Sequence, residues 1–203
     1  MPTGVALRDA REQLFDAAER VLRRDGPNAL TSRAVTTEAG CAKGVLHRHF
    51  ADFDAFLAEL VLDRSARIGN QAAALRDSAG TGTVAGNLTG ALIALFGPVA
   101  VAILSLVISR DGLRARLRQA GSARVPLLAD GAVMIASYLT AERGLGRIAA
   151  DADVDTLAPT LIGAAHLLFT GWEGTPVPAE AVRKVVTTVI AGVAERSERS
   201  AAR

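Results

Sequence analysis

The sequence contains one cysteine and three histidines in 203 residues. A lone Cys41 cannot form an intrachain disulfide, so no disulfide framework is expected. His47 and His49 are two residues apart, which on a helix points their side chains in nearly opposite directions and prevents them from sharing a metal ion. No nucleophile, base and orienting residue can be assembled from so few groups, and no glycine-rich phosphate loop follows a strand. We therefore predict no catalytic residue, no metal and no cofactor, and expect that the protein is not an enzyme.

Aromatic residues are also scarce, at 4% of a composition that is 50% hydrophobic. Long alternating runs of β-branched residues, which half-buried strands need, are missing, whereas alanine, leucine and valine dominate. The composition therefore predicts an all-α protein.

The N-terminal residues carry charges where a secretion signal needs an apolar core, which favours a cytoplasmic location. Residues 91–109 form an apolar run close to the length of a bilayer span, but Gly97 and Pro98 interrupt it. Since proline removes a backbone donor and clashes with the preceding turn, we expect two short buried helices here and no membrane partner.

Apolar periodicity and capping residues predict helices over residues 7–25, 31–39, 42–49 and 52–68, and later over 124–143, 153–169 and 179–196. Residues 76–90 are rich in glycine, serine and threonine and are expected to be at least partly a loop. We assign residues 1–52 to one domain and residues 53–203 to a second, with 52–68 as the connecting helix.

The second and third predicted helices are joined through Ala39 and Gly40, which is typical of a helix-turn-helix. In the third helix, Ala42, Leu46 and Phe50 are spaced to point inward, which leaves an outward face of Lys43, Gly44, His47 and Arg48. Residues 31–50 carry a formal surplus of two positive charges, whereas residues 1–64 as a whole carry nine basic and ten acidic residues. Because the positive charge is concentrated on one edge, this edge is predicted to contact the phosphates of double-stranded DNA.

The segment LTSRAVTTEAGCAKGVLHRHF, followed by ADFDAFL, resembles the signature of the tetracycline-repressor (TetR) family over residues 30–57. The resemblance implies an N-terminal three-helix helix-turn-helix DNA-binding head, linked by a fourth helix to a larger helical ligand-binding and dimerisation domain. Carried over position by position, and with Arg48 added for its outward placement, it implies DNA contacts at Thr31, Ser32, Arg33, Lys43, Gly44, Val45, His47, Arg48 and His49.

Three positions depart from the family pattern. Ala42 stands in place of the usual serine or threonine cap, so the recognition helix lacks a capping acceptor. His47 replaces a tyrosine that commonly contacts phosphate, and Phe53 replaces a common lysine, which removes one expected phosphate contact.

The second domain offers large side chains on apolar helices, most of which are expected to be core. A subset could line a pocket, and the candidates are Phe96, Met134, Tyr138, His166, Phe169 and Trp172. A stripe with small neighbours on the last two helices suits pairing of two subunits, although the same stripe could simply cover the core. The candidate interface residues are Leu161, Ala165, Leu168, Val182, Val186, Val189, Ile190 and Val193.

These features together predict a homodimeric regulator of transcription, in keeping with a repressor that binds a near-palindromic operator and is released by a small apolar or amphipathic effector. The alternative is a small-molecule-binding or interaction protein with a degenerate DNA-binding head.

Overall fold

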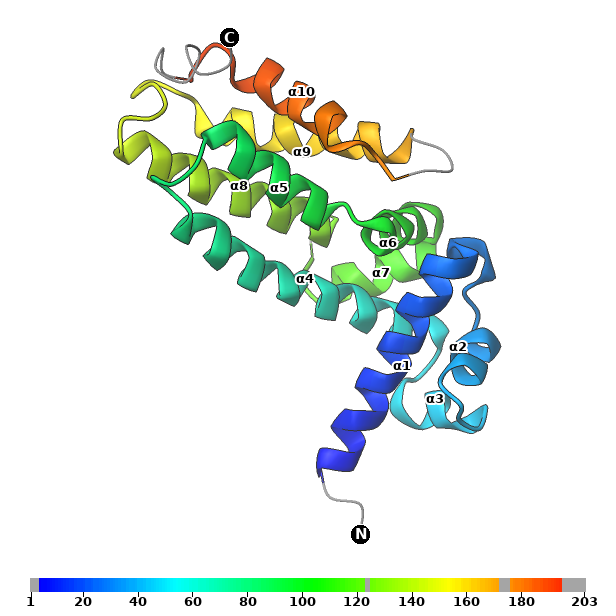
Figure 1. The fold of residues 1–203 in the computed structure, drawn as a ribbon. Helices are drawn as coiled ribbons and strands as arrows, with labels where there is room; N and C mark the ends of the chain where they lie inside the picture. Colours follow the sequence, from blue (N-terminus) through cyan, green and yellow to red (C-terminus); the bar gives the residue numbers. More distant parts are fainter. Residues whose placement is uncertain (1–3, 123–124, 172–175, 195–203) are drawn as a thin grey trace. The chain divides into compact units, whose positions relative to one another are not determined.

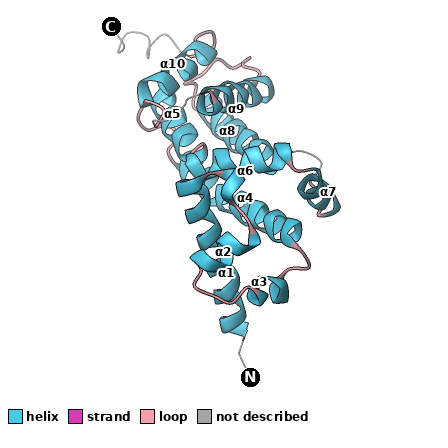
Figure 2. Cartoon of the chain, turned by 90° about the vertical axis from the view of Figure 1, so that its right-hand side faces the viewer, coloured by secondary structure: helices cyan, strands magenta, loops and turns pink. Residues whose placement is uncertain are grey.

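A computed structural model of the chain describes residues 4–122, 125–171 and 176–194. Within these ranges the chain forms ten α-helices and one short 3-10 turn, with no strand (Figures 1 and 2). The expectation of an all-α fold with an N-terminal helix-turn-helix is therefore confirmed. The helices are α1 Gly4–Asp25, α2 Ser32–Glu38, α3 Gly44–His49, α4 Phe53–Asp77, α5 Val84–Leu95, α6 Pro98–Ser109, α7 Asp111–Gln119, α8 Pro126–Gly144, α9 Val154–Thr170 and α10 Ala179–Ile190.

The helices pack into two compact units. The first contains residues 1–63 and 98–125, and the second contains residues 64–97 and 126–203. Helices α6 and α7 thus pack with the N-terminal helices. A division of the chain at residue 52 would place them in the second domain. The functional division at residue 52 stays a prediction.

Several helix ends follow from local capping, as expected. The hydroxyl of Thr31 accepts a hydrogen bond of 3.1 Å from the backbone N–H of Ala34 at the start of α2. The carboxylate of Asp52 accepts one of 2.7 Å from the N–H of Ala55 at the start of α4. Gly40 closes the turn after α2 with φ +66°, a conformation that other residues adopt with strain.

The apolar run is divided as predicted, because α5 ends at Leu95 and Pro98 opens α6. No single helix of the described residues is long and apolar enough to span a membrane, and only α5 and α6 together, as a bent pair, meet that test by length and composition.

The loop expected within residues 76–90 lies between α4 and α5. It covers residues 78–83, because α4 runs to Asp77 and the hydroxyl of Thr83 caps α5 by accepting a 3.0 Å hydrogen bond from the N–H of Gly86. Helix α7 was not predicted, although Leu113 and Leu117 are buried one turn apart along it.

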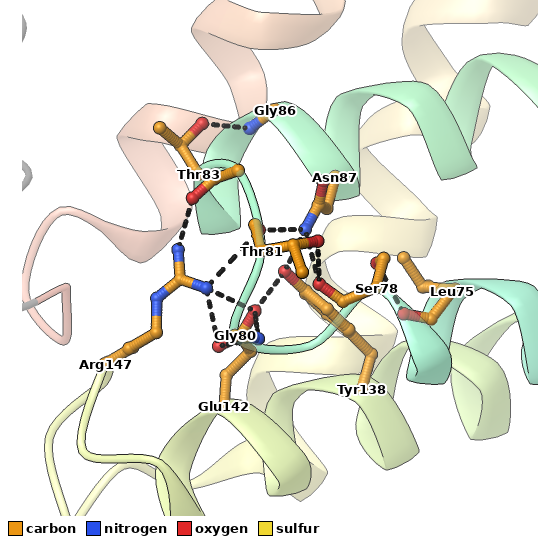
Figure 3. A network of polar contacts seen from close by, with 11 residues as sticks. Leu75, Ser78, Gly80, Thr81, Thr83, Gly86, Asn87, Tyr138, Glu142 and Arg147 are labelled. Atoms are coloured by element: carbon orange, nitrogen blue, oxygen red, sulfur yellow. Dashed lines mark hydrogen bonds and ion pairs between the residues drawn. The ribbon is translucent and has the colours of Figure 1, made fainter.

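In the second unit a buried polar network holds this loop against α8 (Figure 3). The Tyr138 hydroxyl donates a 2.5 Å hydrogen bond to the fully buried carboxylate of Glu142, which also accepts from the N–H of Gly80 at 3.3 Å. The Asn87 amide donates to the Tyr138 oxygen at 3.0 Å, and Arg147 approaches Glu142 to 3.3 Å. The network joins the ends of α4, α5 and α8 through one buried carboxylate.

Tyr138 provides a direct test of this network, because it is the only tyrosine in the chain. Burial, and secondarily the hydrogen bond to Glu142, raises the pKa of Tyr138 above its ordinary value. The unfolded phenol therefore ionises near pH 10 while the folded one stays protonated, so the free energy of unfolding is expected to fall as the pH rises above about 10. A spectrophotometric titration of the phenol, folded and in denaturant, measures this shift. Phenolate appearing at the same pH in both states would contradict the network.

Candidate nucleic-acid interface

The candidate interface is built on α2 and α3. Leu46, 0% exposed, and Phe50, 3% exposed, anchor α3 to the first unit's core. The Phe50 ring contacts Phe15 of α1 at 5.9 Å and Phe56 of α4 at 5.0 Å between ring centres. This apolar attachment fixes which face of α3 points outward.

One inward assignment is wrong. Ala42 is exposed and lies before α3, which begins only at Gly44. Because the helix starts two residues later than expected, the spacing from Ala42 to Leu46 does not place Ala42 on the buried face. Lys43 is the N-cap residue of α3 and makes no side-chain capping hydrogen bond, as the missing serine or threonine at residue 42 suggested.

All nine candidate DNA-contacting residues lie on α2, α3 or the residues that immediately precede them. Six are exposed, namely Thr31, Arg33, Lys43, Gly44, His47 and Arg48, and three are partly exposed, namely Ser32, Val45 and His49. The structure thus brings the nine residues into one helix-turn-helix with most of its charged side chains in solvent. Their contact with DNA stays a prediction.

The positive charge that this surface exposes is larger than its formal surplus of two, because its one acidic residue is already paired. Glu38, the only acidic residue between residues 31 and 50, is paired with Arg20 and Arg24 of α1 at 2.8 Å each. Hydrogen bonds from Arg20 and then Arg24 hold the pKa of Glu38 below its usual value, so it remains ionised and paired.

By contrast, Arg33, Lys43 and Arg48 have no ion-pair partner among the described residues. Three such cations on an exposed helix-turn-helix are suited to bind an anionic backbone.

The end of α3 is held by Arg11 of α1. Its guanidinium lies 4.6 Å from the Phe50 ring centre, donates a 3.3 Å hydrogen bond to the carbonyl of His49 and pairs with Glu59 of α4. Arg11 therefore links α1, the C-terminus of α3 and α4, a role that its place in the sequence does not predict. The only sequence signal is a polar residue early in an otherwise amphipathic helix.

We expect Arg11→Met to weaken operator binding by about three- to ten-fold, because the end of α3 loses a cation–π contact and a hydrogen bond that together contribute about 1–2 kcal/mol. Fluorescence anisotropy at several salt concentrations measures this. The salt slope should not change, since Arg11 faces α3 and α4. Arg23→Ala is a matched control, as Arg23 is exposed on the same helix. A salt slope lowered by one unit would instead make Arg11 a phosphate ligand.

Phe53, at the position of the missing lysine, is partly exposed and stacks on Phe56 at 5.6 Å. Arg110, the residue before α7, lies 5.8 Å from the Phe53 ring and pairs with Asp54 at 2.7 Å, while Arg116 of α7 pairs with Asp52. The start of α4 is thus fixed to α7 by two ion pairs.

The ligand-pocket candidates are not gathered in one place. Phe96 stacks on Phe169 at 5.5 Å and lies 6.1 Å from His166. His166 Nδ1 is buried without a hydrogen-bond partner in the described chain, and burial lowers its pKa. Tyr138 instead belongs to the polar network, and Met134 lines a groove of about 260 Å³ against α4. Trp172 lies outside the described residues.

Five interface candidates are buried within the protomer, namely Leu161, Ala165, Val182, Val186 and Ile190. They lie where α10 packs closely against α5 and α9. This burial favours the alternative that the stripe covers the protomer's own core. Leu168, Val189 and Val193 are partly exposed, and Leu167 on α9 is 73% exposed. Pairing of two subunits stays a prediction.

Comparison with known proteins agrees with this geometry. Residues 14–60 match the model of the bacterial regulatory proteins, tetR family. No curated protein matches the sequence.

Solved structures match over nearly the whole chain. A TetR-family transcriptional regulator from Agrobacterium tumefaciens is 11% identical, covers 93% of this chain and 99% of its own, and has a TM-score of 0.69. A TetR-family member from Streptomyces coelicolor is 23% identical over 89% of this chain and 98% of its own, with a TM-score of 0.59. The regulator FadR from Bacillus subtilis, solved with stearoyl-CoA, is 18% identical over 89% and 98%, with a TM-score of 0.63.

The helix-turn-helix segment of this chain thus matches the model of the tetR family of bacterial regulatory proteins, and its described residues share the fold of solved TetR-family regulators.

Proposed function

We propose that the protein is a cytoplasmic, non-enzymatic regulator that represses transcription by binding a near-palindromic operator as a homodimer. The observation that carries the proposal is the exposed face of α3, where Lys43 and Arg48 have no ion-pair partner among the described residues while Leu46 and Phe50 fix the helix from behind. A short helix held in this way, with free cations outward, is suited to enter a major groove.

We further propose that a small apolar or amphipathic effector releases the DNA. Release requires that the effector bind better to a conformation in which the two recognition helices of a dimer no longer match successive major grooves, about 34 Å apart. The complex of Bacillus subtilis FadR with stearoyl-CoA supports the choice of a ligand with an apolar part, since that protein has a similar fold.

Footprinting on the DNA that flanks the protein's own gene tests the proposal. We expect protection of a near-palindromic site, with affinity that falls steeply as the salt concentration rises. The absence of any sequence preference at moderate salt would refute the regulator and favour the second candidate, a small-molecule-binding protein with a degenerate head. That candidate is favoured by the uncapped start of α3 and by Phe53 in place of a lysine.

Pairing of subunits is tested at Leu167. If α9 and α10 form the interface, Leu167→Glu places a charge in an apolar contact and is expected to shift the protein from dimer to monomer by light scattering, with helicity unchanged. Val133→Glu is the matched control, because Val133 on α8 is 70% exposed. A stable dimer in Leu167→Glu would place the interface elsewhere.

A further inference from the structure

A groove of about 370 Å³ lies between the C-terminal half of α4 and α5, within the second unit. It is lined by Gln71, Ala74, Leu75 and Ser78 from α4 and the residues that follow it, and by five residues of α5, namely Gly86, Asn87, Gly90, Ala91 and Ala94. Small residues on both helices leave this volume open where larger side chains would fill it.

Among the described residues, no charged side chain lines the groove. An ionised ligand would exchange its hydration for apolar surface and neutral amides, with no counter-charge to offset the loss. A neutral, largely apolar molecule loses little hydration there and gains from covering alanine and leucine surface. The lining therefore favours a neutral ligand.

One polar atom of the groove lacks a partner. Gln71 Oε1 is buried and accepts no hydrogen bond in the described chain. The other amide is already committed, because Asn87 Nδ2 lies within 3.3 Å of the Ser78 carbonyl, 2.9 Å of the Thr81 carbonyl and 3.0 Å of the Tyr138 hydroxyl. Leaving a buried acceptor without a hydrogen bond costs free energy. A ligand that donates a hydrogen bond to Gln71 would therefore bind favourably.

We propose that this groove binds a neutral, mainly apolar small molecule that donates an O–H or N–H hydrogen bond to Gln71. The proposal deepens the proposed function, on which it rests, by naming the class of effector and its site. Asn87 and Ser78 belong both to the groove and to the network around Glu142, so the bound molecule would lie beside the loop that this network holds.

Isothermal titration calorimetry of the full chain without DNA tests the proposal with three probes of matched chain length. These are 1-octanol, which donates a hydrogen bond, octyl methyl ether, which does not, and octanoate, which is charged. We expect 1-octanol to bind, with the ether and octanoate each about ten-fold weaker or more. In Gln71→Leu the difference between octanol and the ether should vanish.

Two neighbouring alanines provide matched variants. Ala74 lines the groove and Ala73 does not, and both are exposed on α4. We expect Ala74→Phe to fill the groove and abolish octanol binding, and Ala73→Phe to leave it unchanged. No octanol binding by the folded protein, equal binding of octanoate, or binding that survives Ala74→Phe would each overturn the proposal.

The readout separates this inference from the proposed function. If the protein binds octanol, the three variants behave as expected and the protein shows no operator preference, only the DNA-binding role is refuted. Operator binding without any octanol binding would refute only the groove.

Discussion

Lys43→Ala is expected to weaken operator binding by about ten- to one hundred-fold, the cost of one lost contact to a base edge or phosphate. Lys43 is exposed at the start of α3 and has no ion-pair partner among the described residues, so the substitution removes nothing that holds the fold. The melting temperature and the oligomeric state should therefore stay unchanged.

Measuring the affinity over a range of salt concentrations separates the two possible contacts. A phosphate contact lowers the salt slope by about one unit, whereas a contact to a guanine edge leaves the slope and relaxes preference at one base pair. Arg23→Ala removes the same charge from an exposed site on α1 and controls for long-range attraction. Equal losses in the two variants would remove Lys43 from the contact surface.

The head was predictable because its signals are local. Thr31, Gly40 and Asp52 each set a helix end through a hydrogen bond or a backbone conformation within a few residues, and the structure places all three as expected. Leu46 and Phe50 follow from helical spacing. Ala42 was misplaced because a helix start that moves by two residues changes which face a residue occupies.

The long-range partners could not be predicted. Glu38 is neutralised by α1, and Asp52 and Asp54 are paired by Arg116 and Arg110, over separations of 14 to 64 residues. The sequence shows that such groups are charged, but the pairing depends on packing between helices.

The stripe on α10 illustrates the same limit. Periodicity correctly indicates that Val182, Val186 and Ile190 are buried, but it does not distinguish the protomer's own core from a second subunit. Because Val186 is fully buried within the protomer, Val186→Asp would report on folding and not on pairing.

The buried network of the second unit should be the most sensitive part of the fold. Glu142 is 0% exposed, whereas the side chain of Arg147 is 22% exposed. Arg147→Met leaves a buried carboxylate without its cation and also removes the 2.6 Å hydrogen bond to the Gly82 carbonyl. We expect the free energy of unfolding to fall by about 3–5 kcal/mol, measured by urea denaturation of the full chain.

Glu142→Gln should cost less, because the amide oxygen that it introduces can still accept from Tyr138 and the remaining Arg147 cation is close enough to the surface to reach water. The double variant should then be more stable than Arg147→Met alone, since the uncompensated charge is gone. If the losses in the two single variants simply add in the double variant, the cost of Arg147→Met does not come from an unpaired buried carboxylate. Arg147 then stabilises the fold through its hydrogen bonds to the carbonyls of the 78–83 loop, of which the bond to Gly82 is the shorter.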